Sequence, residues 1–116
     1  MDKYENQEQV AVKAKELTEK LSVRVTPFCF YDPDNNDEMI VGFLKEPSRL
    51  VKMRALDKAV TGHFSAASEI LEVCLIKEES NPRIWSEAPA DDAVYIGACD
   101  AASNLVKKLV DNFKKK

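Results

Sequence analysis

Only one region of this chain has the composition of β-strands, and that region limits the fold more than any other feature. Residues 23–31 and 39–44 are rich in β-branched and aromatic side chains, and an Asp-Pro-Asp-Asn-Asn-Asp turn separates them. They predict an antiparallel β-hairpin with a long loop. A two-stranded sheet alone is only marginally stable in water. We therefore expect that helices cover one face of the hairpin or that another chain extends it.

Two residues inside the predicted strands add to this expectation. Pro27 lacks the N–H that a neighbouring strand would use, so its strand is expected at a sheet edge or with a bulge at this point. Gly42, inside the second strand, predicts either a bulge or the close approach of another group to the backbone.

Four further stretches repeat apolar residues with helical spacing, at residues 5–21, 47–60, 64–76 and 91–113. The first carries one narrow apolar stripe, formed by Val10, Ala14, Leu17 and Leu21. A chain of 116 residues has the length of one domain. The expected fold class is α+β: an N-terminal helix, the antiparallel hairpin and then three helices packed as a small bundle, in a single domain over residues 1–116.

The predicted helix over residues 47–60 is apolar on two sides. Pro47 is expected to open it, because the first turn of a helix does not need the N–H that proline lacks. Thr61-Gly62 is expected to end it. Its two apolar stripes are Leu50-Met53-Leu56-Val60 and Val51-Ala55-Ala59. The sequence therefore predicts that this helix is contacted from two directions.

The last two predicted helices each turn one apolar face toward a core. In the helix over residues 64–76, the polar residues expected at the surface are Ser65, Ser68, Glu69 and Glu72. The final helix is expected to begin at a cap on Asp91 or Asp92 and to carry Phe113 near its far end. Gly97 lies among alanines in this helix and predicts a close crossing with another helix.

Charge and cysteine content exclude several functional classes. The net charge of −3 gives the molecule no overall basic surface for nucleic acid. Three widely spaced cysteines and a single histidine favour free thiols over a disulfide framework or a zinc site. The sequence has no apolar run long enough to span a membrane, and its polar N-terminus is unlike a secretory signal. We expect a cytoplasmic protein.

Two groups of polar residues resemble binding sites but lack some of the residues that such sites need. Asp32-x-Asp34-x-Asn36 resembles the start of a calcium loop, but Asp37 stands where the loop needs glycine and Phe43 where it needs a bidentate glutamate. The basic residues of the 47–60 helix spread around it instead of sharing a face with aromatic residues, which favours a solvated or acid-paired surface. These residues are Arg49, Lys52, Arg54 and Lys58.

A thiol enzyme would need His63, the only imidazole, beside a reactive cysteine. Cys74 and Cys99 fall inside apolar stripes, and Cys29 stands between two phenylalanines of a strand. The glycines are isolated and form no phosphate-binding loop. The sequence therefore predicts no catalytic, metal-binding or cofactor-binding residues, and a chain that is not an enzyme.

Trp85 is the residue that most favours binding, because it stands in a polar loop between Pro82 and Pro89 and tryptophan is enriched at binding hot spots. Alternatively, Trp85 and Ile84 fold back to cap the helical core. The sequence leaves both interpretations open.

Three phrases of the sequence resemble a known family. Val41–Arg49 leads from a strand into a helix, Ile70–Ile76 follows, and a charged loop with a tryptophan precedes Tyr95-Ile96-Gly97-Ala98. This order resembles small proteins of tailed bacteriophages, particularly the tail assembly chaperones, over roughly residues 41–109.

The resemblance implies a non-enzymatic role. Such proteins bind the long hydrophobic tape measure protein, help tail tube subunits assemble around it, tend to self-associate and act in the cytoplasm of the bacterial host. The alternative is a structural or accessory virion protein that acts by protein–protein interaction. For the partner-binding surface we expect Phe43, Pro47, Arg49 and Trp85.

Overall fold

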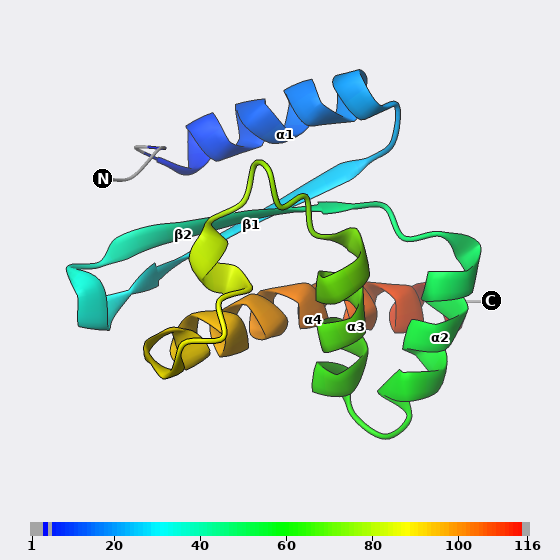
Figure 1. The fold of residues 1–116 in the computed structure, drawn as a ribbon. Helices are drawn as coiled ribbons and strands as arrows, with labels where there is room; N and C mark the ends of the chain where they lie inside the picture. The colour runs from blue at the N-terminus through cyan, green and yellow to red at the C-terminus, as the bar shows by residue number, and fades with distance from the viewer. Residues whose placement is uncertain (1–3, 5, 115–116) are drawn as a thin grey trace.

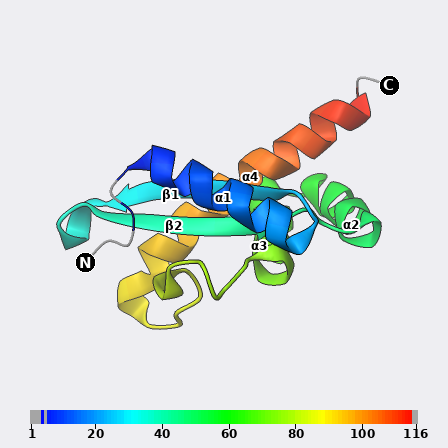
Figure 2. The ribbon, with the colours of Figure 1, turned by 90° about the horizontal axis from the view of Figure 1, so that it is seen from above.

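The computed structural model describes Tyr4 and residues 6–114, which form three layers. Helix α1 (Gln7–Leu21) lies on one side of a hairpin formed by β1 (Val25–Asp32) and β2 (Glu38–Lys45). Helices α2 (Arg49–Ala59), α3 (His63–Cys74) and α4 (Asp92–Lys114) lie on the other side (Figures 1 and 2). The predicted α+β class and the order of elements are confirmed. The predicted first helical residue, Glu5, lies outside the described residues.

Local signals explain how α1 begins, packs and ends. The Asn6 side chain accepts the Gln9 backbone N–H at 3.0 Å, which caps the helix. Thr18 ties the helix to the sheet, because its hydroxyl accepts the Val25 N–H at 3.0 Å. Ser22 ends the helix in the left-handed conformation. The buried residues of α1 are the predicted Val10, Ala14 and Leu17, whereas Leu21 is 39% exposed.

The hairpin is regular and covered on both faces. Its register runs without a bulge from Val25 opposite Lys45 to Asp32 opposite Glu38. One face packs against α1 in a core with Met39, Val41 and Phe43, and the other faces α2–α4 through residues such as Ile40 and Leu44. The helices therefore do more than the sequence predicted, since they enclose both faces of the sheet. Coverage of both faces also explains why β2 is an almost continuous apolar run.

The outer edge of β2 is closed by the segment that follows α3. The Ile76 N–H donates to the Phe43 carbonyl at 2.9 Å, and the Asn81 N–H donates to the Val41 carbonyl at 2.9 Å. The Phe43 N–H donates to the Ser80 hydroxyl at 3.1 Å. Because this segment takes the place of a third strand, the sheet keeps one open edge, along β1.

The helices of the α2–α4 layer begin or end at residues that differ from the predicted ones. Helix α2 begins two residues after Pro47, because Ser48 is the cap and accepts the Val51 N–H at 3.3 Å. Helix α3 ends at Cys74, after which Leu75 bridges to Leu44. Helix α4 starts at Asp92 after a short 3-10 turn over Pro89–Asp91. The packing of Phe113 lies outside the described side chains.

Gly97 allows a different close approach from the one predicted. A Cβ atom at Gly97 would lie 2.7 Å from the Phe30 ring of β1, so this glycine accommodates a strand aromatic and not a crossing helix. Phe30 stacks in turn on Phe28, with ring centroids 6.4 Å apart. Phe28 and Phe30 thus fill the space between the sheet and α4.

Candidate functional site

The four residues predicted to bind a partner do not form one surface. Phe43 is fully buried, with its ring 6.1 Å from that of Tyr4, and Pro47 is also buried. Both predictions are wrong for a surface role: Phe43 lies on β2, which helices enclose on both faces, and Pro47, after the end of β2, is buried as well. Arg49 is exposed at the start of α2, while Trp85 lies on the loop before α4, at the other end of the molecule (Figures 1 and 2).

The sequence left open whether Trp85 and Ile84 cap the helical core or whether Trp85 belongs to a binding surface, and the two residues differ in this respect. Ile84 is fully buried and belongs to the core beneath α3 and α4. Trp85 is 36% exposed, lines a cleft of about 610 Å³ with Leu71 and Tyr95, and has the Lys77 ammonium 5.7 Å from its ring centroid. The tryptophan is therefore a half-exposed wall of a shallow cleft.

The largest departure from ordinary burial is on α2. Its stripe of Val51 and Ala55 is buried against the core. The other stripe faces outward: Leu50 is 64% exposed, Met53 58% and Val60 87%. We call the residues Leu50, Met53, Leu56 and Val60 the α2 patch. The two stripes were recognised in the sequence, but the expectation that both are contacted holds within this chain for only one of them.

A cleft borders the α2 patch on one side. It has a volume of about 610 Å³ and is walled by Met53, Leu56 and Val60 of the patch, together with Ala59, His63 and Val110. Asp57 is the one acidic residue among its described lining residues. The cleft therefore offers an apolar depression beside an apolar helical face.

Ion pairs hold α2 in the position that exposes the patch. Glu69 of α3 is buried and accepts hydrogen bonds from Arg54 at 2.9 Å and from Lys58 at 2.6 Å. The hydrogen bond from Lys58 is the main cause that lowers the pKa of Glu69. Lys52 pairs with Glu46 at 2.5 Å. The expected surface position of Glu69 is wrong. The basic residues of α2 were expected to be solvated or paired with acids, and Lys52, Arg54 and Lys58 are paired with acids.

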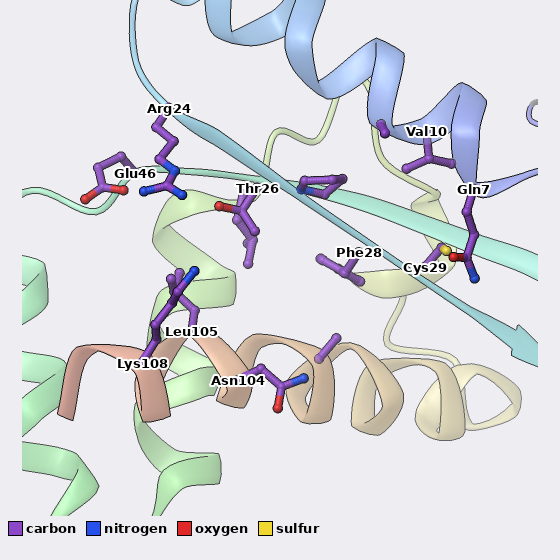
Figure 3. Close-up of a pocket in the computed structure, with 14 residues that line it drawn as sticks. Gln7, Val10, Arg24, Thr26, Phe28, Cys29, Glu46, Asn104, Leu105 and Lys108 are labelled. Atoms are coloured by element: carbon purple, nitrogen blue, oxygen red, sulfur yellow. The ribbon is translucent and has the colours of Figure 1, made fainter. Parts of the chain in front are cut away.

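A second candidate surface runs along the open edge of β1. Figure 3 shows a groove with β1 at its floor, α1 on one side and α4 on the other. Its volume is about 590 Å³. We call it the edge groove, and its described lining residues are Gln7, Val10, Ala11, Arg24, Thr26, Pro27, Phe28, Cys29, Leu44, Glu46, Ala101, Asn104, Leu105 and Lys108. Pro27 was one sequence signal for it, since it predicted that β1 lies at a sheet edge or carries a bulge.

A thiol enzyme needs a histidine beside a reactive cysteine, and neither candidate surface brings the two together. His63 begins α3 beside the α2 patch, in a cleft whose described lining residues include no cysteine. Cys74 and Cys99 are buried, and Cys29 is half-buried in the edge groove. Burial raises the pKa of all three thiols. A raised pKa keeps a thiol protonated, which weakens it as a nucleophile.

The acidic hairpin turn has a structural partner. Arg83 contacts Asp32 at 2.8 Å, Glu38 at 2.6 Å and Asp91 at 2.7 Å, so one guanidinium ties the hairpin to the start of α4. Its hydrogen bond is the largest cause that lowers the pKa of Asp91. At Glu38, burial opposes the shift, but hydrogen bonds from Arg83, Asn35 and Asn81 lower the pKa overall. We term these contacts the Arg83 cluster.

Two further findings concern metals and membranes. Within Tyr4 and residues 6–114, no group of three or more histidine, cysteine, aspartate or glutamate residues is placed to hold a metal ion. None of the helices in this part of the chain has the length and apolar character needed to cross a membrane.

Comparison with known proteins adds no relative: no family model, no curated protein and no solved structure matches the chain. The functional argument therefore rests on the surfaces themselves.

Proposed function

We propose that this chain is a non-enzymatic protein that binds another polypeptide through the α2 patch. The observation that carries this proposal is the outward stripe of Leu50, Met53 and Val60, each more than half exposed. Single exposed apolar residues are common on soluble proteins. Here they share one face of a helix and border an apolar cleft, and contiguous patches of this kind mark interaction sites.

The shape of the α2 patch favours a helical partner. Apolar residues spaced three and four apart on one helix can pack against a similar stripe on another helix. The cleft beside the patch gives room for one large side chain of the partner. Long coiled-coil proteins present such stripes along their whole length, so they fit this surface.

We propose further that the role is that of a phage tail assembly chaperone. The phrases Val41–Arg49, Ile70–Ile76 and Tyr95–Ala98 support this through their resemblance to that family. An exposed apolar patch suits a protein that keeps a hydrophobic tape measure protein soluble while tail tube subunits assemble. Self-association and action in the cytoplasm of the bacterial host belong to the same proposal.

Co-expression tests this role. We expect a co-expressed long coiled-coil protein of the tape measure type to become several-fold more soluble with the wild type and to co-purify with it. The double variant Leu50→Gln/Met53→Gln should lose both effects. Ile96→Gln is the matched control, because Ile96 is 58% exposed but lies on α4, outside the patch. Unchanged solubility together with no co-purification would contradict the proposal.

Mass spectrometry of purified particles distinguishes the alternative role. A chaperone of assembly is expected to be absent from them. Detection of the chain in stoichiometric amounts would instead assign it as a structural or accessory virion protein.

A further inference from the structure

The edge groove exposes a row of β1 backbone groups that are spaced as an added strand would need them. On β2, the backbone groups of Val41 and Phe43 turn away from β1, toward Asn81 and Ile76. Their partners in the register are Cys29 and Pro27. Because pairs in an antiparallel ladder alternate, the Cys29 N–H and C=O and the Pro27 C=O point out from β1 into the groove.

The same alternation extends to both ends of β1. It turns the N–H and C=O of Tyr31 outward beyond Cys29, and those of Val25 outward before Pro27. The Val25 N–H is already taken by Thr18. The outward groups that remain repeat every second residue, which is the spacing that a neighbouring strand presents. We propose that the edge groove binds one extended segment of another polypeptide, which joins the sheet as a third strand beside β1.

The walls of the groove define the side chains of that segment. Successive side chains of a strand point to opposite faces. On the α1 side they would meet Val10, Ala11 and Cys29, and on the α4 side Phe28, Ala101 and Leu105. These six side chains make the middle of both walls apolar, while Gln7, Asn104 and Lys108 lie around them. The segment is therefore apolar at about four successive positions, where it lies between these side chains.

One end of the groove is cationic. Arg24 and Lys108 lie at the end where β1 begins, opposite the end that holds Gln7 and Cys29 (Figure 3). Glu46 lies near the same end, but its carboxylate is paired with Lys52. The segment therefore carries an aspartate or glutamate next to its apolar run, where it meets the two cations.

A second copy of this chain fits the groove less well than a single strand. Neighbouring strands lie about 4.8 Å apart. In a second copy, β1 also lies between α1 and α4, so pairing of the two strands would bring the helices of both copies together. A lone extended segment has no such obstacle.

Selection from a displayed library of random 12-residue peptides against the full chain tests the proposal. We expect enriched peptides to contain about four successive apolar residues beside an acidic one. Their affinities are then measured for the wild type, Ala101→Arg and Ala11→Arg, which place a long side chain in the groove from opposite walls. Ala93→Arg is the matched control, because Ala93 is exposed on α4 outside the groove.

The expected result is binding at least tenfold weaker to Ala101→Arg and Ala11→Arg and unchanged to Ala93→Arg. A proline at the centre of the peptide should weaken binding equally, because it removes a backbone N–H. In NMR spectra, the Cys29 and Tyr31 amides should shift on addition of peptide. The proposal is overturned if no peptide is enriched, or if both groove variants bind normally.

Two other outcomes would also overturn it and leave the α2 patch proposal untouched. Peptides whose binding is lost in Leu50→Gln/Met53→Gln and kept in the groove variants would belong to the patch. A wild-type dimer that Ala101→Arg converts to a monomer would make the occupant a second copy. Circular dichroism and thermal unfolding of each variant establish that the fold is intact.

Discussion

The Phe28 ring lies directly over Gly42, its partner on the neighbouring strand. A Cβ atom at position 42 would stand 2.2 Å from Cζ of this ring, so the hydrogen side chain of glycine is what allows the aromatic residue to cover the strand. Cross-strand pairs of an aromatic residue and a glycine stabilise sheets in this way. Gly42 therefore marks the close approach that the sequence predicted as one of two alternatives, and the register excludes the bulge.

Gly42→Ala is expected to destabilise the protein by about 1–3 kcal/mol, the usual range for overpacking. Urea unfolding of the two proteins measures the difference in free energy. Gly62→Ala is the control, because no atom lies within 4 Å of a Cβ at position 62 and its backbone is extended. That variant should change the free energy by less than about 1 kcal/mol. Equal effects of the two substitutions would show that the contact between Phe28 and Gly42 does not contribute to the free energy of unfolding.

Gly97→Ala tests the contact between α4 and β1. In an exposed helix this change stabilises by about 1 kcal/mol through helix propensity. Here the added methyl group meets the Phe30 ring at 2.7 Å, so we expect a net loss of about 1 kcal/mol. The double variant Phe30→Leu/Gly97→Ala should show a smaller loss than the sum of the two single variants. A stabilised single variant would contradict the packing described for Phe30.

Arg83→Met is expected to destabilise the protein by about 3 kcal/mol, because it leaves the buried Asp32 without its cation. The measurement is the free energy of unfolding at pH 7. Arg49→Met is the matched control, since Arg49 is exposed and should change the free energy by less than about 0.5 kcal/mol.

The same variant has a characteristic pH dependence. Because the folded-state pKa values of Glu38 and Asp91 are lowered, these carboxylates stabilise the fold fully above their unfolded values of about 4. This stabilisation is lost as the pH falls through the lower folded values. The gap between wild type and Arg83→Met should therefore shrink below about pH 4. A gap that stays constant from pH 7 to pH 3 would contradict the Arg83 cluster.

The two stripes of α2 should respond differently to the same substitution. Met53→Gln changes a side chain that is 58% exposed, so the free energy of unfolding should stay within about 0.5 kcal/mol. Val51→Gln places an amide at a position that is 9% exposed, and a loss of about 2 kcal/mol is expected. Thermal unfolding of both variants checks this. Equal losses would mean that the α2 patch is packed against the protein.

Periodicity was enough to predict the class and order of the elements, because the stripe of α1 and the β-rich run of 39–44 each match one regular structure. The limits of α2 were harder. Pro47 and Ser48 both suit a helix start, and the hydrogen bond from the Val51 N–H to Ser48 decides between them. Such a choice depends on local geometry that composition does not record.

The candidate surfaces were less predictable for a different reason. Phe43 was expected at a partner-binding surface on a hairpin with open edges, whereas α1 covers the face of β2 that carries it. Pro47, which follows the hairpin, is buried as well. The outward stripe of α2 was visible in the sequence. Its exposure depends on the ion pairs that Glu69 of α3 makes with Arg54 and Lys58, and these form only when the two helices pack together.

Hydrogen–deuterium exchange of the chain in complex with a long coiled-coil protein of the tape measure type tests the central claim most directly. If the α2 patch is the binding surface, exchange at the backbone amides of Arg49–Ala59 should slow markedly on binding, and Leu50→Gln/Met53→Gln should abolish the effect. A stable complex that leaves exchange in α2 unchanged would contradict the account.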